Sequence, residues 1–175
     1  VGSAPFAGAG LRVVDVTHDG CRNASDEEVD AVDAIVTALL AGDVEWRGED
    51  GQGGRLTPAD ILVVAPYNAH VGRLQERLSA RGVSVGTVDK FQGQESPIVI
   101  YSMATSRPED APRGMEFLYS LNRLNVATSR AKCLCVLVAS PAVFEVSCRT
   151  PRQMQLANAF CRYLELATPI ANIAG

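Results

Sequence analysis

The chain alternates between short runs of consecutive apolar residues and longer segments in which apolar residues recur every three or four positions. The runs predict strands buried on both faces of a sheet, because such strands have no exposed alternate positions. The periodic segments predict helices that each bury one face. The predicted strands cover residues 11–16, 61–66, 83–88, 97–104 and 133–140. This alternation indicates the α/β class, with a mostly parallel sheet covered by helices on both faces.

Several predicted helices have recognisable ends. Ser25 is placed to cap the first helix, with Glu28 at the spacing of a capping box, and Gly42 ends that helix. Asn68 is expected to cap the second helix, which carries Val71, Leu74 and Leu78 at helical spacing. Later helices are predicted over residues 117–132, 141–146 and 152–166. Residues 43–58 are rich in glycine and charge, and they predict a loop or a loose hairpin.

The length and composition fit one domain. At 175 residues, with 47% hydrophobic and 21% charged residues, the chain can bury a single core. We expect one domain over residues 1–175, with its core at about 11–140 and closing helices at 141–166. The net charge is −4, so charge alone does not make the chain a nucleic-acid binder. Any contact with a nucleic-acid strand must come from a local basic patch or from another part of the molecule.

The cysteines and histidines do not predict a metal site. The five cysteines form no C-x-x-C pair, and His18 and His70 are far apart in the sequence. Cys133 and Cys135 share one face of a predicted strand, where free thiols act as small apolar groups. Unpaired cysteines suit a reducing compartment, so we expect a cytoplasmic protein.

No apolar run reaches the length of a membrane span, and the first five residues lack the features of a secretory signal. The first five residues are typical of the middle of a protein, so we expect this chain to be a fragment of a longer one.

The segment 86–95, G-T-V-D-K-F-Q-G-Q-E, lies between two predicted strands and carries the first candidate chemistry. We expect it at a strand's carboxyl end, where α/β sheets bind ligands. Gly93 lets the backbone approach a ligand closely, and Glu95 is able to accept hydrogen bonds from ribose hydroxyls. The alternative is an ordinary polar turn in which Asp89 and Glu95 are solvated.

The segment 122–132, N-R-L-N-V-A-T-S-R-A-K, carries the second candidate chemistry. Arg130 follows Arg123 by seven residues, which places both on one helix face, two turns apart. Two guanidiniums on one face suit a polyphosphate, since arginine binds phosphate oxygens through a bidentate fork. The alternative is a pair of surface salt bridges, which are frequent and contribute little.

Three ordered segments carry a family resemblance. Residues 87–95 resemble helicase motif V, residues 122–132 resemble motif VI, and residues 62–74, L-V-V-A-P-Y-N-A-H-V-G-R-L, resemble motif IV. Together they place residues 11–140 among the superfamily 1 helicases, in the branch of nonsense-decay helicases and of the helicase–nucleases of replication and repair. The resemblance implies a three-layer RecA-like fold of the P-loop NTPase type, with ATP bound between two such domains.

The resemblance also implies roles for individual residues. Arg130 matches the motif VI arginine finger that reaches the γ-phosphate, and Arg123 joins it in binding the cofactor. Glu95, with Gly93 beside it, matches the acid that contacts the ribose. Tyr67 matches the motif IV aromatic residue placed near the base. The chain departs from the family where a second phosphate-sensing arginine is expected, because Asn68 and Val71 stand there and Arg73 is the nearest substitute.

Contacts with a single strand are implied at three further positions. By similarity, Thr87 and Gln92 touch backbone phosphates and Asn125 organises motif VI around the strand. Such contacts position a motor without recognising sequence. For Thr87 and Asn125 the alternative is ordinary hydrogen bonding within a turn and a helix.

The sequence lacks motifs that ATP hydrolysis requires. It contains no G-x-x-x-x-G-K-[ST] loop, and Gly48–Gly54 lacks both the lysine and a preceding strand. No acidic pair follows a strand in the manner of a metal-holding motif II. An N-terminal RecA-like domain of the same protein is therefore expected to hold most of the ATP and the Mg²⁺. The 175 residues alone are expected not to hydrolyse ATP.

The predicted function is that of the second motor domain of an ATP-dependent helicase that acts on single-stranded nucleic acid. DNA is favoured over RNA because the resemblance leans toward repair enzymes, and 5′-to-3′ movement follows only by analogy. Residues 111–132 are also similar to bacterial proteins that join a RecB-like nuclease to such a helicase, which would place a nuclease upstream of Val1. The main alternative is a non-catalytic RecA-like nucleotide-binding or interaction module. A free-standing Rossmann-like enzyme lacks support, since no G-x-G-x-x-G follows a strand.

Overall fold

A six-stranded sheet forms the centre of the molecule, and all of its strand pairs are parallel. The computed structural model describes residues 5–49, 51–91 and 93–171. The strands are β1 (Gly10–Asp15), β4 (Ile61–Ala65), β5 (Ser84–Thr87), β6 (Ser96–Ser102), β7 (Ala131–Ala139) and β8 (Thr168–Ile170). Their order across the sheet is β5-β4-β6-β7-β1-β8. The predicted parallel sheet is confirmed, and β8 is a strand that the pattern did not predict.

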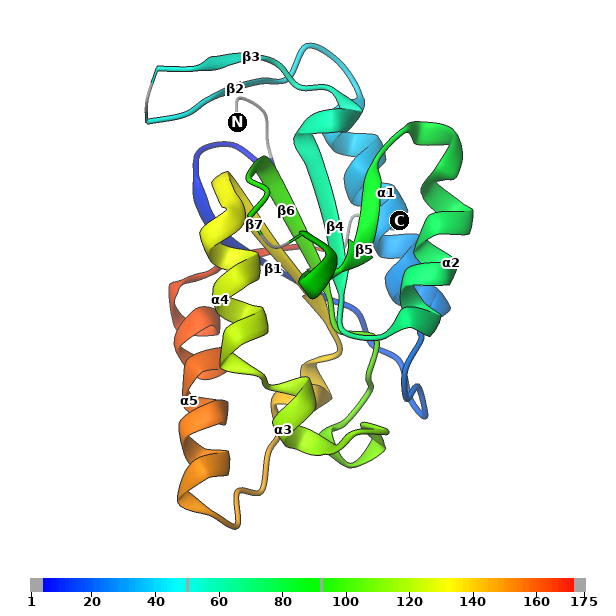
Figure 1. The fold of residues 1–175 in the computed structure, drawn as a ribbon, viewed down its shortest axis with the longest axis vertical. Helices are drawn as coiled ribbons and strands as arrows, with labels where there is room; N and C mark the ends of the chain where they lie inside the picture. The colour runs from blue at the N-terminus through cyan, green and yellow to red at the C-terminus, as the bar shows by residue number, and fades with distance from the viewer. Residues whose placement is uncertain (1–4, 50, 92, 172–175) are drawn as a thin grey trace.

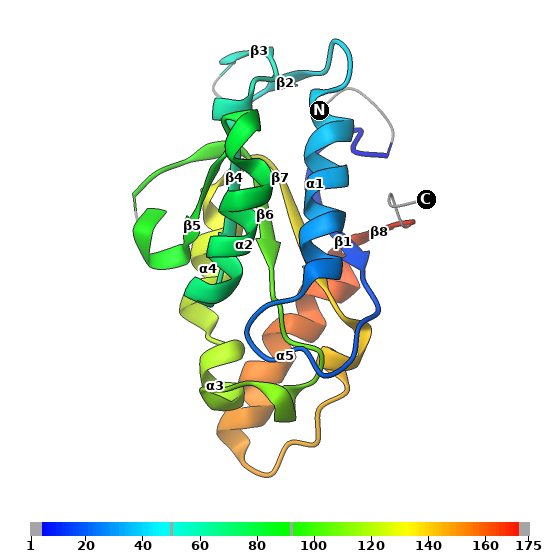
Figure 2. The same ribbon diagram turned by 90° about the vertical axis from the view of Figure 1, so that its right-hand side faces the viewer.

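Helices cover both faces of this sheet, as Figures 1 and 2 show. The helices α1 (Asp26–Leu40) and α2 (Asn68–Leu78) pack on one face. The helices α3 (Gly114–Leu118), α4 (Leu121–Arg130) and α5 (Pro151–Leu166) pack on the other. The predicted three-layer α/β architecture is therefore confirmed.

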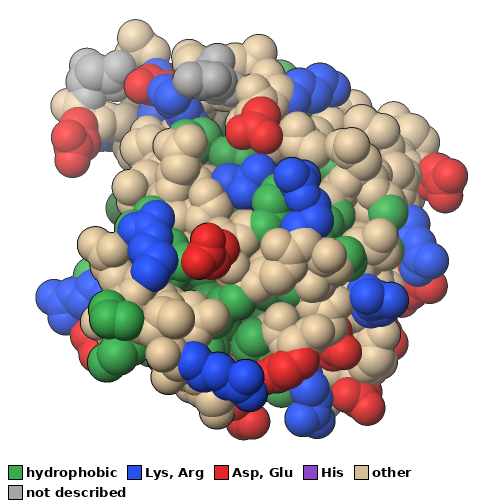
Figure 3. All heavy atoms as spheres, turned by 60° about the horizontal axis from the view of Figure 1, so that its bottom comes forward, with side chains coloured by type: hydrophobic (Ala, Val, Ile, Leu, Met, Phe, Trp, Pro, Cys, Tyr) green, Lys and Arg blue, Asp and Glu red, His purple; other side chains and the backbone are tan. Residues whose placement is uncertain are grey.

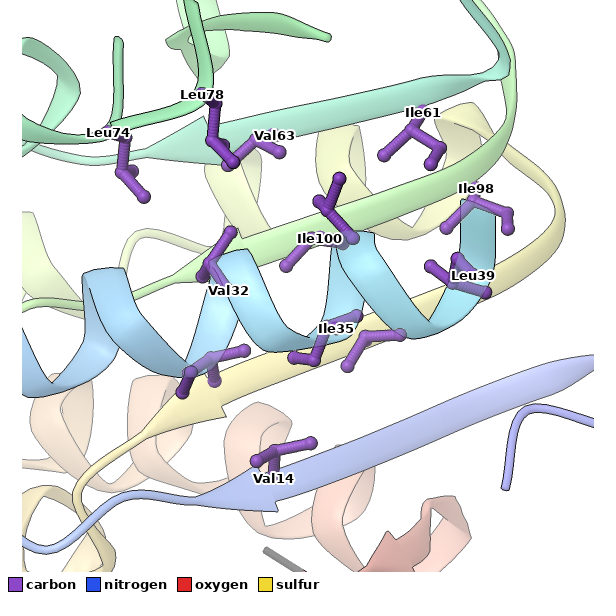
Figure 4. Close-up of a cluster of buried hydrophobic side chains, with 14 of the residues drawn as sticks. Val14, Val32, Ile35, Leu39, Ile61, Val63, Leu74, Leu78, Ile98 and Ile100 are labelled. Atoms are coloured by element: carbon purple, nitrogen blue, oxygen red, sulfur yellow. The ribbon is translucent and has the colours of Figure 1, made fainter. Parts of the chain in front are cut away.

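Alternate residues of the central strands supply two separate cores. In β6, Ile98 and Ile100 face α1 and α2, whereas Val99 and Tyr101 face α3, α4 and α5. Figure 4 shows the first core, in which Val32, Ile35 and Leu39 of α1 lie against strand residues such as Ile98 and Ile100. Since the central strands are covered on both faces, their sequences read as continuous apolar runs.

The two ends of the sheet have different surroundings. In Figure 1 the strands run downward. We call the end where β6 and β7 begin, at Ser96 and Ala131, the amino edge. The end where β4, β5 and β6 finish, at Ala65, Thr87 and Ser102, is the carboxyl edge. A small antiparallel hairpin of β2 (Glu45–Arg47) and β3 (Gly53–Arg55) lies at the amino edge, so the hairpin alternative for residues 43–58 is confirmed.

The helix predicted over residues 117–132 is wrong as a single element. It is broken between α3 and α4, where Tyr119 and Ser120 leave the helical conformation. The break lets the buried Tyr119 donate a hydrogen bond to the backbone oxygen of Val143. Lys132 already belongs to β7. Residues 141–146, predicted as a helix, form only a short 3₁₀ turn at Pro141–Phe144.

The expected helix caps are partly confirmed. Ser25 caps α1, and its side chain accepts a hydrogen bond from the backbone N–H of Glu28. The Glu28 carboxylate does not return the bond, because it turns into the interior. Asn68 is wrong as a cap, since it is already the first residue of α2 and Tyr67 occupies the cap position without a side-chain bond.

The free thiols of Cys133 and Cys135 are buried, as expected. Within the described ranges, no helix combines the length and the apolar character that a membrane crossing needs.

Candidate nucleotide and strand interface

The segment that resembles motif V runs from one edge of the sheet to the other. Thr87 ends β5 at the carboxyl edge, and residues 88–91 form a 3₁₀ turn with Val88 and Phe91 buried. A Cβ on Gly86 would lie 2.8 Å from the Phe91 ring, so the strand passes close under this turn. Glycine is therefore required at position 86, because any larger residue would displace the turn.

Gly93 and Glu95 lie just before β6, at the amino edge. The expectation that they sit at a strand's carboxyl end is therefore wrong. The segment crosses the sheet within eight residues, 88–95, and places its acid at the far edge. Gly93 has a φ of +91°, a conformation that favours glycine. Gln92, an expected strand contact, lies outside the described residues.

Arg130 is the last residue of α4 and immediately precedes β7, so it also lies at the amino edge. Next to it, Lys132 Nζ lies 3.7 Å from Glu95 Oε2. A cleft of about 360 Å³ opens here, lined by Gly48, Glu49, Glu95, Ser129, Ala131 and Lys132. The structure thus brings Glu95 and the end of motif VI together at one cleft, beside the β2–β3 hairpin.

Arg130 forms no ion pair with any acid in the described part of the chain. Its Nε is buried and has no hydrogen-bond partner among the described residues. A buried donor without an acceptor costs free energy, about 1–3 kcal/mol for a typical group. An acceptor supplied from outside the chain, such as a phosphate oxygen, would remove that cost.

Arg123 lies at the other end of α4. Its guanidinium packs over the Phe117 ring, with Cζ 4.0 Å from the ring centroid, and Nη2 lies 3.8 Å from Asp89 Oδ2. The seven residues from Arg123 to Arg130 span about 10 Å along the helix axis. The structure therefore does not gather the two arginines at one end of the helix.

Tyr67 is also far from the amino edge. It follows β4 at the carboxyl edge and is only 6% exposed, with its ring centroid 5.3 Å from that of Phe117. A ring covered in this way has no free face on which a base could stack. Burial also raises the pKa of the Tyr67 hydroxyl. The structure does not bring Tyr67 to Glu95 or Arg130.

Arg73 does not replace the missing motif IV arginine. It belongs to α2, on the face of the sheet opposite α4, and its Nη1 lies 2.5 Å from Asp26 Oδ1. Asn125 is exposed on α4, where its side chain is accessible to a ligand.

A buried polar network at the carboxyl edge went unnoticed in the sequence. The Glu28 carboxylate is fully buried and accepts hydrogen bonds from the Ser102 hydroxyl at 2.5 Å and the Ala104 N–H at 2.9 Å. His18 Nε2 lies 2.9 Å from the same carboxylate. His70 Nε2 lies 2.7 Å from Ser102 Oγ. The network thus ties α1 to the segments that follow β1, β4 and β6.

Two further features of this network are a rare backbone conformation at Ala104 and a lowered pKa at His70. Ala104 has a φ of +66°, which a non-glycine residue rarely adopts, and its N–H bond to Glu28 helps to hold it there. Burial lowers the pKa of His70, although the nearby Glu28 opposes the shift. The only signal in the sequence was that both histidines follow predicted strands, and spacing alone did not place them on one acid.

The amino edge fits the phosphate end of a nucleotide better than a metal ion. Arg130 and Lys132 are cations beside an open cleft, and phosphate oxygens are the ligands that such groups prefer. In the part of the chain that the structure describes, no three His, Cys, Asp or Glu residues are grouped so as to hold a metal ion. These residues suit the phosphate end of a nucleotide.

Comparison with known proteins finds a family model and several helicases that are similar to this chain. A family model described as "AAA domain" matches residues 14–142. The chain is 42% identical over 91 residues to the DNA polymerase alpha-associated DNA helicase A of Schizosaccharomyces pombe, covering 50% of this chain and 13% of the relative. It is 28% identical over 127 residues to the DNA replication ATP-dependent helicase/nuclease JHS1 of Arabidopsis thaliana, covering 73% of this chain and 9% of the relative. It is 33% identical over 95 residues to the human RNA helicase Mov10l1, covering 51% of this chain and 8% of the relative.

Proposed function

Because the chain belongs to the superfamily 1 helicases, we propose that it is the second motor domain of an ATP-dependent nucleic-acid helicase, with Arg130 as its arginine finger. The observation that carries the proposal is the buried Nε of Arg130, which has no partner among the described residues and belongs to a residue whose neighbours Ser129 and Ala131 line the amino-edge cleft. The other half of the site belongs to an N-terminal RecA-like domain of the same protein, which holds the β-phosphate and Mg²⁺. On this proposal the 175 residues alone do not turn over ATP.

The chemistry of the amino edge follows from charge. ATP, when bound, supplies the γ-phosphoryl group, whose oxygens carry the negative charge of the transition state. Arg130 stabilises that charge through a guanidinium already positioned at the end of a helix. Fingers of this kind contribute about 10³ to 10⁵ in rate. Glu95 accepts hydrogen bonds from the ribose, since its contact with Lys132 is long and 55% of its side chain is exposed.

Two residues are left out of this nucleotide site. Tyr67 is covered by Phe117, and Arg123 is held at the far end of α4. Both would have to leave their present contacts to reach a nucleotide at the amino edge. The nucleotide-contacting set that we propose is therefore Arg130, Glu95 and the backbone at Gly93.

We place the binding of the nucleic-acid strand at the carboxyl edge of the sheet. Thr87 ends β5 there, and we assign it to a backbone phosphate together with Gln92, with Asn125 as a further strand contact on α4. DNA is favoured because one relative is named a DNA helicase and another a DNA replication helicase/nuclease, although a third is named an RNA helicase. The helicase/nuclease name of one relative supports a nuclease domain upstream of Val1. A role in DNA repair and a cytoplasmic location complete the proposal, the latter supported by five free cysteines.

The test uses the complete gene product that contains this chain. Strand-stimulated ATP hydrolysis and unwinding are measured on DNA and RNA duplexes with either overhang, for the wild type and Arg130→Ala. We expect hydrolysis to fall by about 10³-fold in the variant, with nucleotide affinity changed by only a few-fold. Arg152→Ala, on the exposed side of α5, is the matched control. An undiminished rate in Arg130→Ala would leave the non-catalytic module as the better description.

A further inference from the structure

Two arginines from different elements meet on one aromatic ring at the carboxyl edge. Arg113 precedes α3, and its Cζ lies 3.9 Å from the centroid of Phe117. Arg123 of α4 places its Cζ 4.0 Å from the same centroid. Stacking on an aromatic face orders a guanidinium while leaving its N–H groups free at the edges. The arrangement holds two forks of donors close to each other before any ligand binds.

The positive charge of this pair is only weakly compensated. Arg123 lies 3.8 Å from Asp89 and donates a 3.3 Å hydrogen bond to the Phe117 backbone oxygen. Arg113 makes no ion pair with an acid in the described ranges. An anion could therefore bind Arg113, which makes no ion pair with a described acid, and Arg123, whose contacts with Asp89 and the Phe117 oxygen are long.

An unsatisfied donor lies beside the same arginines. The Tyr101 hydroxyl is buried, with the residue 1% exposed, and it has no hydrogen-bond partner among the described residues. The Tyr67 hydroxyl is also buried, in a residue 6% exposed, and its neighbour is the Thr105 side chain. Both hydroxyls lie close enough to Arg123 to be affected by its charge, and Tyr67 is also affected by Arg113. Burial raises the pKa of both phenols, so both remain protonated donors. Buried donors without acceptors are uncommon and point to a bound group.

The cluster also lies where the topology favours a ligand. The connection that leaves β4 passes to α2 on one face, whereas the connection that leaves β6 passes to α3 and α4 on the other. In open α/β sheets, ligands bind outside the carboxyl ends of two such strands. Figure 3 turns this end of the molecule toward the viewer and shows Lys and Arg side chains across the face, with acidic side chains among them.

We propose that Arg113 and Arg123, ordered by Phe117, bind a backbone phosphate of the nucleic-acid strand. The inference rests on the proposed helicase function and adds residues that the motif resemblance did not assign to the strand. A strand phosphate is favoured over the nucleotide, because Arg123 lies about 10 Å along α4 from Arg130. Contacts of this kind bind without regard to base sequence.

The test measures binding of fluorescein-labelled oligothymidylate and oligouridylate to the complete gene product, without nucleotide, over a range of salt concentrations. Arg113→Ala is expected to weaken binding by about tenfold, the loss of one charged hydrogen bond. The slope of log affinity against log salt concentration should fall by about 0.7, the value for one single-strand phosphate contact. Arg113→Lys should keep the slope, because it keeps the charge, and Arg152→Ala should match the wild type.

The outcomes separate the inference from the function on which it rests. Wild-type protein that binds neither oligonucleotide would contradict the helicase proposal itself. Wild-type binding with an unchanged affinity and slope in Arg113→Ala would overturn only the phosphate site. If Arg113→Ala loses affinity for the nucleotide but still binds the oligonucleotides, the phosphate site would also be overturned, because the guanidiniums would then bind ATP. Arg113 is exposed, so its variants should melt within a few degrees of the wild type. If the melting temperature of Arg113→Ala differs by more than that, the binding measurements are repeated with Arg113→Gln.

Discussion

Arg130 at the amino edge and the Glu28 network at the carboxyl edge differ in whether their buried polar atoms have partners within the chain. At the amino edge, Arg130 has a buried Nε without a partner and stands beside an open cleft. At the carboxyl edge, Glu28, His18 and His70 are buried and bonded to one another or to serine hydroxyls. Satisfied groups hold a shape, whereas an unsatisfied one awaits a ligand or another domain. The difference supports the proposal that Arg130 acts on a group held by a neighbouring domain, whereas the Glu28 network stabilises the fold within the chain.

We expect the largest effect when an arginine is removed from one or the other end of α4 in the complete gene product. Arg130→Ala should lower the ATP hydrolysis rate at saturating strand by about 10³-fold, because transition-state charge loses its cation. Arg123→Ala should leave that rate within about tenfold, since Arg123 contacts Phe117 and Asp89 instead. Steady-state kinetics with saturating oligonucleotide measures both. Equal losses in the two variants would show that α4 acts as one phosphate-binding surface.

Removing the central acid of the carboxyl edge should affect folding. Glu28→Ala leaves His18, Ser102 and the Ala104 N–H without their buried partner, so the free energy of unfolding should fall by about 3 kcal/mol. Urea denaturation measures the change. Glu165→Ala is the control, because Glu165 pairs with Arg162 on the exposed side of α5 and should matter by less than about 1 kcal/mol. Similar losses in the two variants would contradict the structural role of the network.

The same network should make stability depend on pH. Burial lowers the folded-state pKa of His70, so below the unfolded value of about 6.5 the unfolded chain binds a proton that the folded chain does not. Stability should therefore be fully present above that pH and fall as the pH drops below it, by at most about 1.4 kcal/mol per pH unit from this group.

His70→Gln is the comparison for this effect. Glutamine does not titrate, whereas His18, Glu28, Asp26 and Arg73 around position 70 are the same in both proteins. Urea denaturation at several pH values should give a flatter profile for the variant. Parallel profiles would assign the dependence to another group.

The smallest effect concerns the cap that starts α1 beside the network. Ser25→Ala removes the acceptor for the Glu28 N–H and should lower the free energy of unfolding by about 1 kcal/mol. Thr150→Ala removes the corresponding bond at α5, where Thr150 is exposed and water replaces the acceptor more easily. Thermal melting of both variants should therefore show the larger shift for Ser25→Ala. The reverse order would indicate that the carboxyl edge tolerates an unsatisfied donor.

The sequence predicted the periodic features of the fold well. Five of the six sheet strands are marked by apolar runs, and Ser25 was recognisable as a cap because its bond is local. The break between α3 and α4 was missed, since Tyr119 is directed inward by a contact with Val143, 24 residues away in sequence. β8 was missed because only three residues pair with β1.

The candidate site was predictable only in part. Arg130 was placed correctly beside the strand that follows it, because the motif fixes the order of helix and strand. Glu95 was expected at the wrong edge, since spacing does not show that residues 88–95 cross the sheet. The sequence predicts Glu28 only as the acid of a capping box, because its partners Ser102 and Ala104 are more than 70 residues away. Long-range contacts of this kind leave no local pattern.

We propose that the Arg130 guanidinium, at the end of α4, acts on a phosphate held by a neighbouring domain. The most direct measurement is chemical rescue of the Arg130→Ala gene product, in which strand-stimulated ATP hydrolysis is followed while guanidinium ion is added at non-denaturing, millimolar concentrations. We expect the rate to rise with guanidinium and not to rise with equal concentrations of urea or sodium ion. The rates of the wild type and of Arg152→Ala should not rise. A variant whose rate ignores guanidinium, or a wild type that gains as much, would contradict the claim.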